Sequence, residues 1–388
     1  MKPSSPQSNP AADRNDQQIA SSSFARRGLI KGAAAMAGLG VAFRGRNHAA
    51  DTATTKNQLS VAGYAYDRVR AIQDGAVGID GFDISFKAEN IYGLNGSIFG
   101  PARTYSVAEV GLIPYIAKYA NEDFRAYSLI PVFISRIFRH RNIFVRADSG
   151  IEKPEDLKGK RVGTTHYGSS ASTWIRGFLQ DQHQIRAEDV HWVEAVKGSD
   201  GSTPKPQKYF LPDGFPLEKG PAGVDESELL VSGTVQALVP PITPKAFLDR
   251  NPIVKRLYPD VFDVEKAYYR ETGIFPIMHA IAIRRDVVDK NPDLPKAVFE
   301  MYSEAKQIAY ADLETTTSLK VTLPWATQEF EETQELMGRN FWRYGVEANH
   351  KALDAVMRYT HEQGLTKRRV AIEEIFHPST MDLIESQK

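Results

Sequence analysis

Five arginines lie in segments where the chain could hold a charged ligand: Arg68, Arg70, Arg136, Arg139 and Arg141. The planar guanidinium fork binds a carboxylate through two parallel hydrogen bonds. In "SRIFRHR" (135–141), three arginines and one histidine fall within seven residues. Such a density of like charge is unfavourable unless an anion lies nearby. The segment therefore predicts an anion site, and the alternative for each arginine is a solvated or salt-bridged surface position.

Three of the nine histidines are candidates for proton transfer: His140, His166 and His279. Imidazole is the side chain that exchanges protons near neutral pH. His140 belongs to the arginine-rich segment, and His166 precedes a Gly-Ser loop. His279 ends "GIFPIMH", where the chain is expected to return from a second α/β unit to the first. The alternative for each is a hydrogen-bonded histidine of the core.

The segment "THYGSSASTW" (165–174) has the composition of an anion-binding loop. Small residues before a helix let backbone N–H groups and hydroxyls close on an anion, assisted by the helix dipole. Ser169 and Ser170 are the candidate ligands, and the alternative is a simple N-cap formed by Ser169, Ser170 or Ser172. The aromatic side chains that could stack on a ligand ring are Tyr64, Tyr66, Tyr167 and Trp174, with a place in the hydrophobic core as their alternative.

Composition argues against several other chemistries. Lys plus Arg equals Asp plus Glu, at 48 residues each, and no basic stripe is present, so nucleic acid is not an expected partner. Cysteine is absent, which removes disulfides, thiolate metal sites and cysteine nucleophiles. No zinc motif, dinucleotide fingerprint or P-loop is found. We therefore expect no cofactor, or at most a loosely held metal.

The mature chain alternates between predicted strands and helices, the pattern of an α/β protein. The predicted strands are 59–66, 81–89, 126–133, 141–150, a short strand around Val162, 189–195, a strand that ends at Pro240, and 279–286. The predicted helices are 105–123, kinked or restarted at Pro114, then 171–183, a helix that begins near Glu226, and most of the chain after Pro292. Residues 197–225 are rich in Gly and Pro and predict a surface excursion.

The 388 residues, of which 42% are hydrophobic, suffice for two α/β lobes. The chain is expected to cross between lobes near 140–148 and to return near 276–286. Lobe 1 then comprises 57–143, lobe 2 comprises 144–279, and 280–388 return to lobe 1 and add C-terminal helices. The ligand of such a bilobal protein lies in the cleft between lobes, outside the carboxyl ends of strands.

Residues 1–50 predict a disordered tail followed by a removable export signal. In "FARRGLIKGAAAMAGLG" (24–40), two arginines precede a small apolar run that is too short to span a bilayer. This pattern resembles the twin-arginine type of signal, with cleavage near Asp51. We expect export to the periplasm by the twin-arginine machinery, and the alternative is a short amphipathic helix.

Several longer segments resemble a known family. "KPEDLKGKRVG" (153–163) resembles the lobe-opening segment of type II periplasmic binding proteins. "IPVFISRIFRHRNIFVRADSGI", "YYRETGIFPIMH", "VTLPW", "YGVEANHKALDAVMRYTHEQGL" and "YDRVRAIQDGAVGIDGFDISF" are together similar to the 4,5-dihydroxyphthalate decarboxylase family. The likeness covers most of residues 59–377. It implies the type II periplasmic-binding-protein fold, two α/β lobes with a ligand cleft between them.

Four positions depart from the family pattern. Members usually carry Asp where this chain has Ser106, and serine-rich positions where it has Gly111 and Pro114. Gln236 stands where an Asp is common. These differences leave the expected fold unchanged and bear on the identity of the ligand.

The resemblance and the export signal together suggest two functions. The first, favoured because an exported protein is separated from a cytoplasmic degradation pathway, is a solute-binding protein that delivers a small aromatic carboxylate to an ABC-type transporter permease. The second is a cofactor-independent decarboxylase of a hydroxylated aromatic acid, with His279, His140 and Arg139 as its catalytic residues. The predicted ligand-binding residues are Tyr66, Arg68, Arg70, Ser106, Arg136, Arg139, His166, Ser169, Ser170, Trp174, Thr243 and His279.

Overall fold

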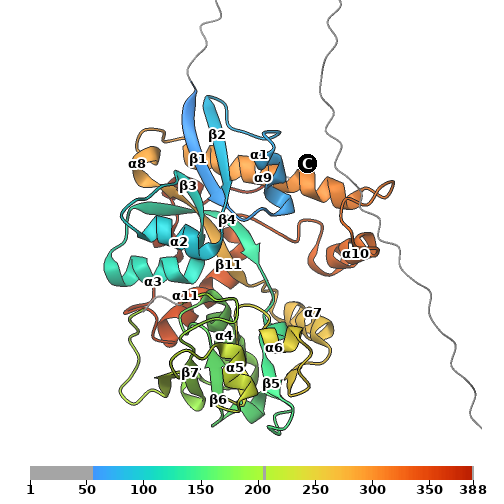
Figure 1. The fold of residues 1–388 in the computed structure, drawn as a ribbon. Coiled ribbons are helices and arrows are strands. Elements are labelled where there is room, and N and C mark those ends of the chain that lie inside the picture. Colours follow the sequence, from blue (N-terminus) through green and yellow to red (C-terminus); the bar gives the residue numbers. More distant parts are fainter. Residues whose placement is uncertain (1–55, 204–206, 387–388) are drawn as a thin grey trace, which may run out of the picture. The chain divides into compact units, whose positions relative to one another are not determined.

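Two mixed β-sheets carry the fold in the computed structural model, which describes residues 56–203 and 207–386 (Figure 1). The first sheet has the strand order β2-β1-β3-β11-β4, and the second has the order β10-β5-β9-β6-β7-β8. The predicted export segment, residues 24–40, lies outside the described residues. Within them, no helix has the length and apolar character needed to cross a membrane.

The first sheet takes its strands from two distant parts of the chain. They are β1 (Asn57–Gly63), β2 (Phe82–Ala88), β3 (Val107–Gly111), β4 (Tyr127–Arg136) and β11 (Ile277–Arg284). β11 lies between β3 and β4 and runs antiparallel to both, while β1 runs parallel to β2 and β3. β3 and β4 are buried along their whole length, as expected for central strands with both faces covered.

Helices cover both faces of the first sheet. The helices of this part are α1 (Arg70–Gln73), α2 (Ile91–Phe99), α3 (Leu112–Glu122), α8 (Arg285–Val288), α9 (Leu294–Glu314), α10 (Ala326–Met337), α11 (His350–Glu362) and α12 (Ile372–Ile375). Of these, α10 packs on α9, and α11 packs on α3 and on α4 (Ser170–His183). Side chains of α9 pack on the face that carries Val107 and Ile281. Side chains of α2 and α3 pack on the opposite face with Ala108 and Val110.

The second sheet is formed by shorter strands. They are β5 (Phe144–Arg146), β6 (Arg161–Thr164), β7 (His191–Glu194), β8 (Leu217–Lys219), β9 (Ala237–Leu238) and β10 (Val254–Arg256). Its helices are α4 (Ser170–His183), α5 (Glu226–Val231), α6 (Lys245–Leu248) and α7 (Val261–Thr272). One hydrophobic core cluster includes Tyr115 of α3, Trp174 of α4 and Tyr359 of α11, so it continues from the first sheet to the second.

The predicted helix over residues 105–123 is wrong in its first part. Residues 107–111 form β3, and α3 begins only at Leu112. Because β3 is buried on both faces, it lacks the alternation that marks a half-exposed strand, and its valines at 107 and 110 have helical spacing. Pro114 lies in the first turn of α3, where its missing N–H group leaves no hydrogen bond unmade.

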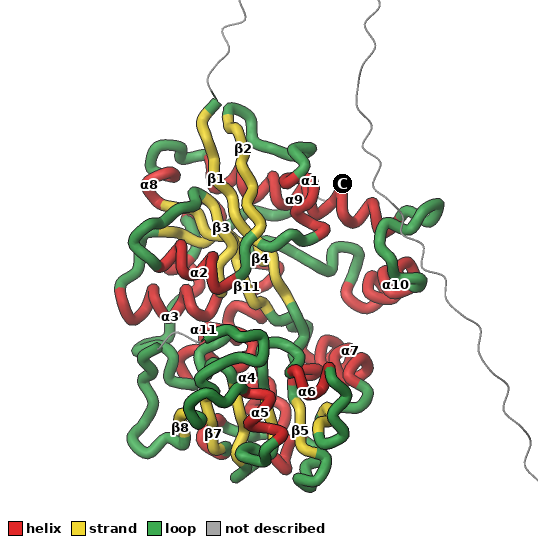
Figure 2. The backbone as a smooth tube through the Cα atoms, in the orientation of Figure 1, coloured by secondary structure: helices red, strands yellow, loops and turns green. Residues whose placement is uncertain are grey.

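The predicted surface excursion over residues 197–225 is only partly correct. Much of it runs as loop (Figure 2), but β8 adds a strand to the second sheet. Tyr209 and Phe215 pack on the main hydrophobic core, and the backbone N–H of Phe210 donates to Gly364 O at 2.7 Å. Aromatic side chains therefore pack this segment on the core, although its Gly and Pro content predicts a surface excursion.

Candidate active site

The carboxyl ends of β1, β3 and β4 and the amino end of β11 meet at one edge of the first sheet. In the register of the sheet, His279 of β11 lies opposite Gly111 of β3, and Ile277 lies opposite Arg136 of β4. Tyr64 and Tyr66 follow β1 at the same edge. Strand ends of this kind are where α/β proteins place their ligands.

Glu109 is the centre of the polar contacts at this edge. Its side chain is completely buried and accepts three hydrogen bonds. The backbone N–H of Tyr64 donates to Oε2 at 2.9 Å, the Tyr66 hydroxyl donates to Oε1 at 2.9 Å, and Nδ1 of His279 lies 2.6 Å from Oε1. A Cβ atom at Gly63 would lie only 3.1 Å from Oε2, so glycine there leaves room for the carboxylate.

The Glu109–His279 pair has the geometry of a carboxylate that orients an imidazole. With Nδ1–H donating to Glu109, the ring is held in one tautomer and Nε2 is the nitrogen left for proton exchange with a ligand. The side chain of His279 is 16% exposed, and its ring stacks on Tyr64 with centroids 6.2 Å apart. Burial and the nearby Glu109 charge raise the pKa of Tyr66, so its hydroxyl remains a donor to the carboxylate.

Arg139 has no carboxylate partner among the described residues. Its Nη1 donates to Pro241 O at 2.8 Å, and its Nε lies 3.2 Å from Sδ of Met278, the residue before His279. Burial lowers the pKa of Arg139 to about 10, so the guanidinium still carries its charge at neutral pH. A buried cation with no ion pair is a candidate partner for an anionic ligand.

Arg136 and Arg68 have partners within the fold, whereas Arg70 is exposed. Arg136 donates to Asn349 Oδ1 and Phe275 O, both at 2.7 Å, and burial lowers its pKa to about 9. Arg68 donates twice to Ile134 O, and its guanidinium lies 4.0 Å from the centre of the Tyr66 ring. Arg70 is exposed at the start of α1.

Ser106 lies at the opposite end of β3 from the Glu109–His279 pair. It precedes the first residue of the strand, and its hydroxyl lies 3.2 Å from that of Ser60. The structure therefore does not bring Ser106 to the edge where the other candidates meet. Four residues of extended strand separate Ser106 from Gly111, a span of about 16 Å.

The start of α4 is attached to β11 next to His279. The Ser170 hydroxyl donates to Met278 O at 3.2 Å, and Trp174 Nε1 donates to Ile277 O at 2.9 Å. Trp174 is completely buried, as its core alternative predicts. Ser169 caps α4 by accepting from Ser172 N at 3.1 Å, which confirms the capping alternative for that residue.

His166 and Thr243 belong to loops of the second sheet. His166 follows β6 and is partly buried, and its backbone carbonyl accepts from Ser169 N at 3.1 Å. Thr243 is partly buried between β9 and α6.

His140 lies in an aromatic cluster rather than at the sheet edge. Its ring stacks on Phe178 with centroids 4.1 Å apart and also packs against Tyr258 and Tyr268. Burial outweighs the contact with Gln182 and lowers the pKa of His140 to about 4. A neutral imidazole within a hydrophobic cluster is a poor proton donor, so the structure gives no support to His140 as a catalytic residue.

Replacing His140 by Leu is expected to reduce the acid sensitivity of the fold. In the unfolded chain His140 binds a proton near pH 6.5, whereas in the folded chain it stays neutral down to about pH 4. The free energy of unfolding therefore falls as the pH drops through that window. The wild type should lose roughly 2 kcal/mol more than the variant between pH 7 and pH 5. Urea unfolding at the two pH values measures the difference, with the exposed His350→Gln as control. Equal losses in wild type and His140→Leu would contradict a buried neutral imidazole.

Among residues 56–203 and 207–386, no group of three or more His, Asp or Glu side chains is placed to hold a metal ion. A surface hollow of about 490 Å³ is lined by residues of and after α6, including Phe247 and Leu248. It contains none of the predicted site residues.

Glu109 is the functional candidate that the sequence did not predict. A signal was present, because "VAEVG" places one carboxylate inside an otherwise apolar segment. A buried carboxylate is unfavourable unless it is paired and hydrogen-bonded, so a carboxylate in a central strand points to a partner.

Comparison with known proteins finds one family pattern and two relatives that share a name. The "NMT1/THI5 like" family pattern matches residues 132–201. A 4,5-dihydroxyphthalate decarboxylase of Comamonas testosteroni is 35% identical over 328 residues, which cover 84% of this chain and 98% of the relative. A 4,5-dihydroxyphthalate decarboxylase of Pseudomonas putida is 36% identical over 55% of this chain and 82% of the relative.

Solved structures show the same fold. A periplasmic sulfonate-binding protein from Methylobacillus flagellatus KT matches with a TM-score of 0.50 and 14% identity, over 84% of this chain and 92% of that chain. The predicted type II periplasmic-binding-protein fold is thereby confirmed. Because the relative from Comamonas testosteroni is 35% identical and is matched over 98% of its length, the chain belongs to the 4,5-dihydroxyphthalate decarboxylase family.

Proposed function

We propose that this protein is a carboxy-lyase that removes CO2 from a hydroxylated aromatic acid, with His279 as the proton donor. The observation that carries the proposal is the 2.6 Å contact between His279 Nδ1 and the buried Glu109. A binding site needs hydrogen-bond donors and charge, whereas a carboxylate that orients an imidazole is a device for proton transfer. The names of the relatives support a decarboxylase more directly than a transport protein.

The chemistry requires one proton at one ring carbon. In 4,5-dihydroxyphthalate, each carboxylate is para to a hydroxyl group. Protonation of the carbon that bears the carboxylate forms a C–H bond, and the para oxygen stabilises the positive charge that results. The C–C bond then breaks, its electron pair returns to the ring, and CO2 leaves. His279 becomes neutral and regains its proton from solvent, while Glu109 stabilises the imidazolium form.

Arg139 is the proposed partner of a substrate carboxylate. The residue is 8% exposed, and its guanidinium bonds only to a carbonyl oxygen and a thioether among the described residues. The contact is with Met278, the residue before His279 on β11. A charge-assisted hydrogen bond from the guanidinium to the substrate carboxylate would fix the orientation of the ring.

Replacing Arg139 by Lys is expected to raise KM by about 10- to 100-fold. The charge is retained, but the ammonium group cannot form the paired hydrogen bonds of a guanidinium, and a hydrogen bond to a charged group contributes about 1.5–3 kcal/mol. Steady-state kinetics with the ring acid measures the change, and the exposed Arg70→Lys is the matched control. An unchanged KM in a folded Arg139→Lys variant would exclude the carboxylate role.

The second candidate is a solute-binding protein that passes an aromatic carboxylate to a transporter permease. The arginine pair and apolar run of residues 24–40 favour it, because an exported protein would be separated from a cytoplasmic degradation pathway. The same fold can serve either function. Arg139 and the stacked tyrosines would serve a binding protein as well as an enzyme.

One experiment separates the two candidates. The purified chain is incubated with 4,5-dihydroxyphthalate, and CO2 release and thermal shift are followed in the same samples. Release of CO2 with formation of 3,4-dihydroxybenzoate supports the lyase. A thermal shift without CO2 would contradict it and favour binding alone.

We also propose that the protein is exported to the periplasm by the twin-arginine route. The support is the sequence of residues 24–40, with Arg26 and Arg27 before a short apolar run. A reporter fused behind residues 1–55 should reach the periplasm and remain in the cytoplasm when both arginines are changed to Lys. A reporter that stays in the cytoplasm with the native arginines would contradict export.

A further inference from the structure

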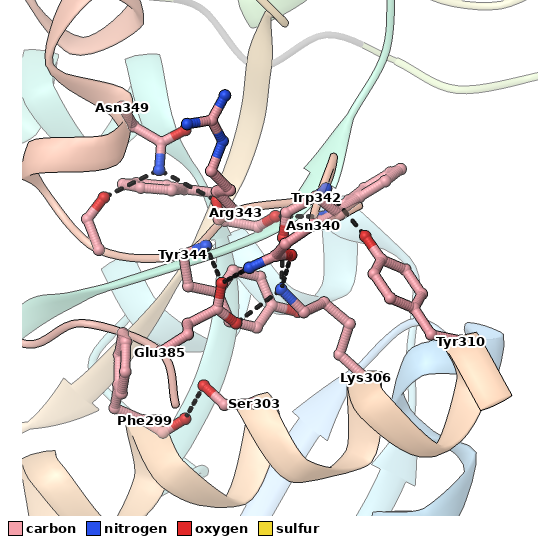
Figure 3. Close-up of polar contacts among 12 residues, drawn as sticks. Phe299, Ser303, Lys306, Tyr310, Asn340, Trp342, Arg343, Tyr344, Asn349 and Glu385 are labelled. Atoms are coloured by element: carbon pink, nitrogen blue, oxygen red, sulfur yellow. Dashed lines mark hydrogen bonds and ion pairs between the residues drawn. The ribbon is translucent and has the colours of Figure 1, made fainter. Parts of the chain in front are cut away.

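The last described residues of the chain are anchored by a buried carboxylate. Glu385 is 7% exposed, and its Oε1 lies 2.6 Å from Nζ of Lys306 in α9. Its Oε2 accepts from Asn340 Nδ2 and from the backbone N–H of Tyr344, both at 2.8 Å (Figure 3). A Cβ atom at Gly345, where φ is +93°, would lie 2.8 Å from Leu383 O. The C-terminal segment therefore packs directly on the loop that contains Gly345.

Lys306 joins this segment to the loop that contains Trp342. Its side chain is fully buried and also donates to Asn340 Oδ1 at 2.9 Å and to Trp342 O at 2.7 Å (Figure 3). These two hydrogen bonds and the ion pair with Glu385 are the polar contacts of the ammonium group. Burial lowers the pKa of Lys306 to about 8, and the Glu385 carboxylate opposes that change. Removing the carboxylate would therefore leave a buried cation without its ion pair.

Trp342 in turn contacts the residues around Glu109. The Arg68 guanidinium lies between two rings, 4.1 Å from the centre of the Trp342 ring and 4.0 Å from that of Tyr66. Trp342 Nε1 donates to Phe133 O at 2.8 Å, which fixes the indole on β4. The hydroxyl of Tyr66 then donates to Glu109 Oε1, the same oxygen that His279 contacts.

We propose that Glu385 is a positioning residue for the Glu109–His279 pair, acting through Lys306, Trp342, Arg68 and Tyr66. The Glu385–Lys306 pair holds the backbone of the loop at Trp342, the Trp342 ring packs on Arg68, and Arg68 packs on Tyr66, whose hydroxyl reaches Glu109. Each step is a direct contact between the named side chains or their backbone. The inference extends the proposed function but concerns only the hydrogen bonds of the pair, so it is testable without substrate.

The test is a double-mutant cycle on the full-length chain. The variants are Glu385→Gln, Tyr66→Phe and their combination, and the readout is the pair of ¹⁵N chemical shifts of the His279 ring, which report tautomer and hydrogen bonding. Tyr66→Phe removes one of the donors to Oε1 and should move the Nδ1 shift. Glu385→Gln should move it in the same direction, and the double variant should match Tyr66→Phe alone, because both changes act on one hydrogen bond.

Two controls distinguish positioning from general destabilisation. Glu194→Gln alters another buried carboxylate, which pairs with Lys219, and Ile384→Ala alters an 81% exposed residue of the same C-terminal segment. Both should leave the His279 shifts unchanged, and Glu194→Gln should still lower Tm. If Glu385→Gln does not fold, Trp342→Phe weakens the same pathway within an intact C-terminal segment and should move the shift.

The proposal would be overturned if Glu385→Gln lowers Tm but leaves the ¹⁵N shifts of the His279 ring at their wild-type values. It would also be overturned if the shift changes of the two single variants add in the double variant. Because the NMR readout needs no turnover, an absence of decarboxylase activity would not affect it. If the chain is active, kcat should fall in Glu385→Gln while KM remains within about two-fold, since Arg139 is unaffected.

Discussion

Replacing His279 by Gln is expected to lower kcat for CO2 release by about 10²- to 10⁴-fold, the usual contribution of a general acid. Glutamine can still donate a hydrogen bond to Glu109, so the buried carboxylate keeps a partner and the fold should persist. It cannot deliver a proton to a ring carbon. Steady-state rates and thermal unfolding, measured on the same preparation, separate the loss of chemistry from a loss of structure.

The matched control for this substitution is His350→Gln, which removes an exposed imidazole at the start of α11. It should retain wild-type kcat and Tm. Ligand-induced thermal shift should survive in His279→Gln, because the proposed carboxylate partner is Arg139. A His279→Gln variant with full activity would exclude this histidine as the proton donor and would direct attention to His166.

The position of His279 at the start of a returning strand was predictable because topology limits where a returning chain can enter a sheet. β11 runs antiparallel to its neighbours, so the chain enters it at the edge where β3 and β4 end. A residue at the start of such a strand lies among the carboxyl ends of the others. The prediction needed only the point at which the chain returns from the second α/β unit to the first.

Glu109 could not be predicted in the same way. A strand buried on both faces has no alternating pattern, and Val107, Val110 and the apolar residues after it continue into the spacing of α3. Interpreted as part of a helix, Glu109 belongs to an ordinary polar face. Its partners Tyr64 and His279 are distant in sequence, and only the pairing of β3 with β1 and β11 brings them together.

The arginine-rich segment shows a second limit of sequence reasoning. Its charge density predicted one shared anion, but the structure separates the three arginines. Arg136 bonds to carbonyl and amide oxygens, Arg141 pairs with Glu265 at 2.7 Å, and Arg139 has no carboxylate. The chain leaves β4 and forms a short 3₁₀ turn here, which directs successive side chains to different neighbours. Composition gives the number of charges, whereas their partners depend on the backbone path.

Replacing Glu109 by Gln is expected to lower kcat by about 10²- to 10⁴-fold with little change in KM, because loss of the orienting carboxylate in comparable histidine sites has effects of this size. The amide retains the shape of the side chain but not its charge, so it no longer stabilises the imidazolium form of His279. The amide has an NH2 group in place of one carboxylate oxygen, and this donor would face either the Tyr64 N–H or the Tyr66 hydroxyl. We therefore also expect a lower Tm.

Glu194 offers a matched control for Glu109 on the second sheet. It is 3% exposed and likewise accepts from a tyrosine backbone N–H and a tyrosine hydroxyl, those of Tyr167 at 2.8 Å and Tyr209 at 2.9 Å, but it pairs with Lys219. Glu194→Gln should lower Tm comparably and leave kcat within about two-fold. Loss of activity in Glu109→Gln alone then reports the charge beside His279.

The combined variant Glu109→Gln/His279→Gln gives the strongest test of the pair as one unit. If Glu109 acts only through His279, the double variant should be no slower than His279→Gln, because an orienting group has nothing left to orient. Two losses that multiply would mean that Glu109 contributes separately, as an acid in its own right or as a determinant of substrate position. Such a result would leave the site intact but would reassign the proton donor, since His279 would then share that role with a carboxylate that the fold keeps completely buried.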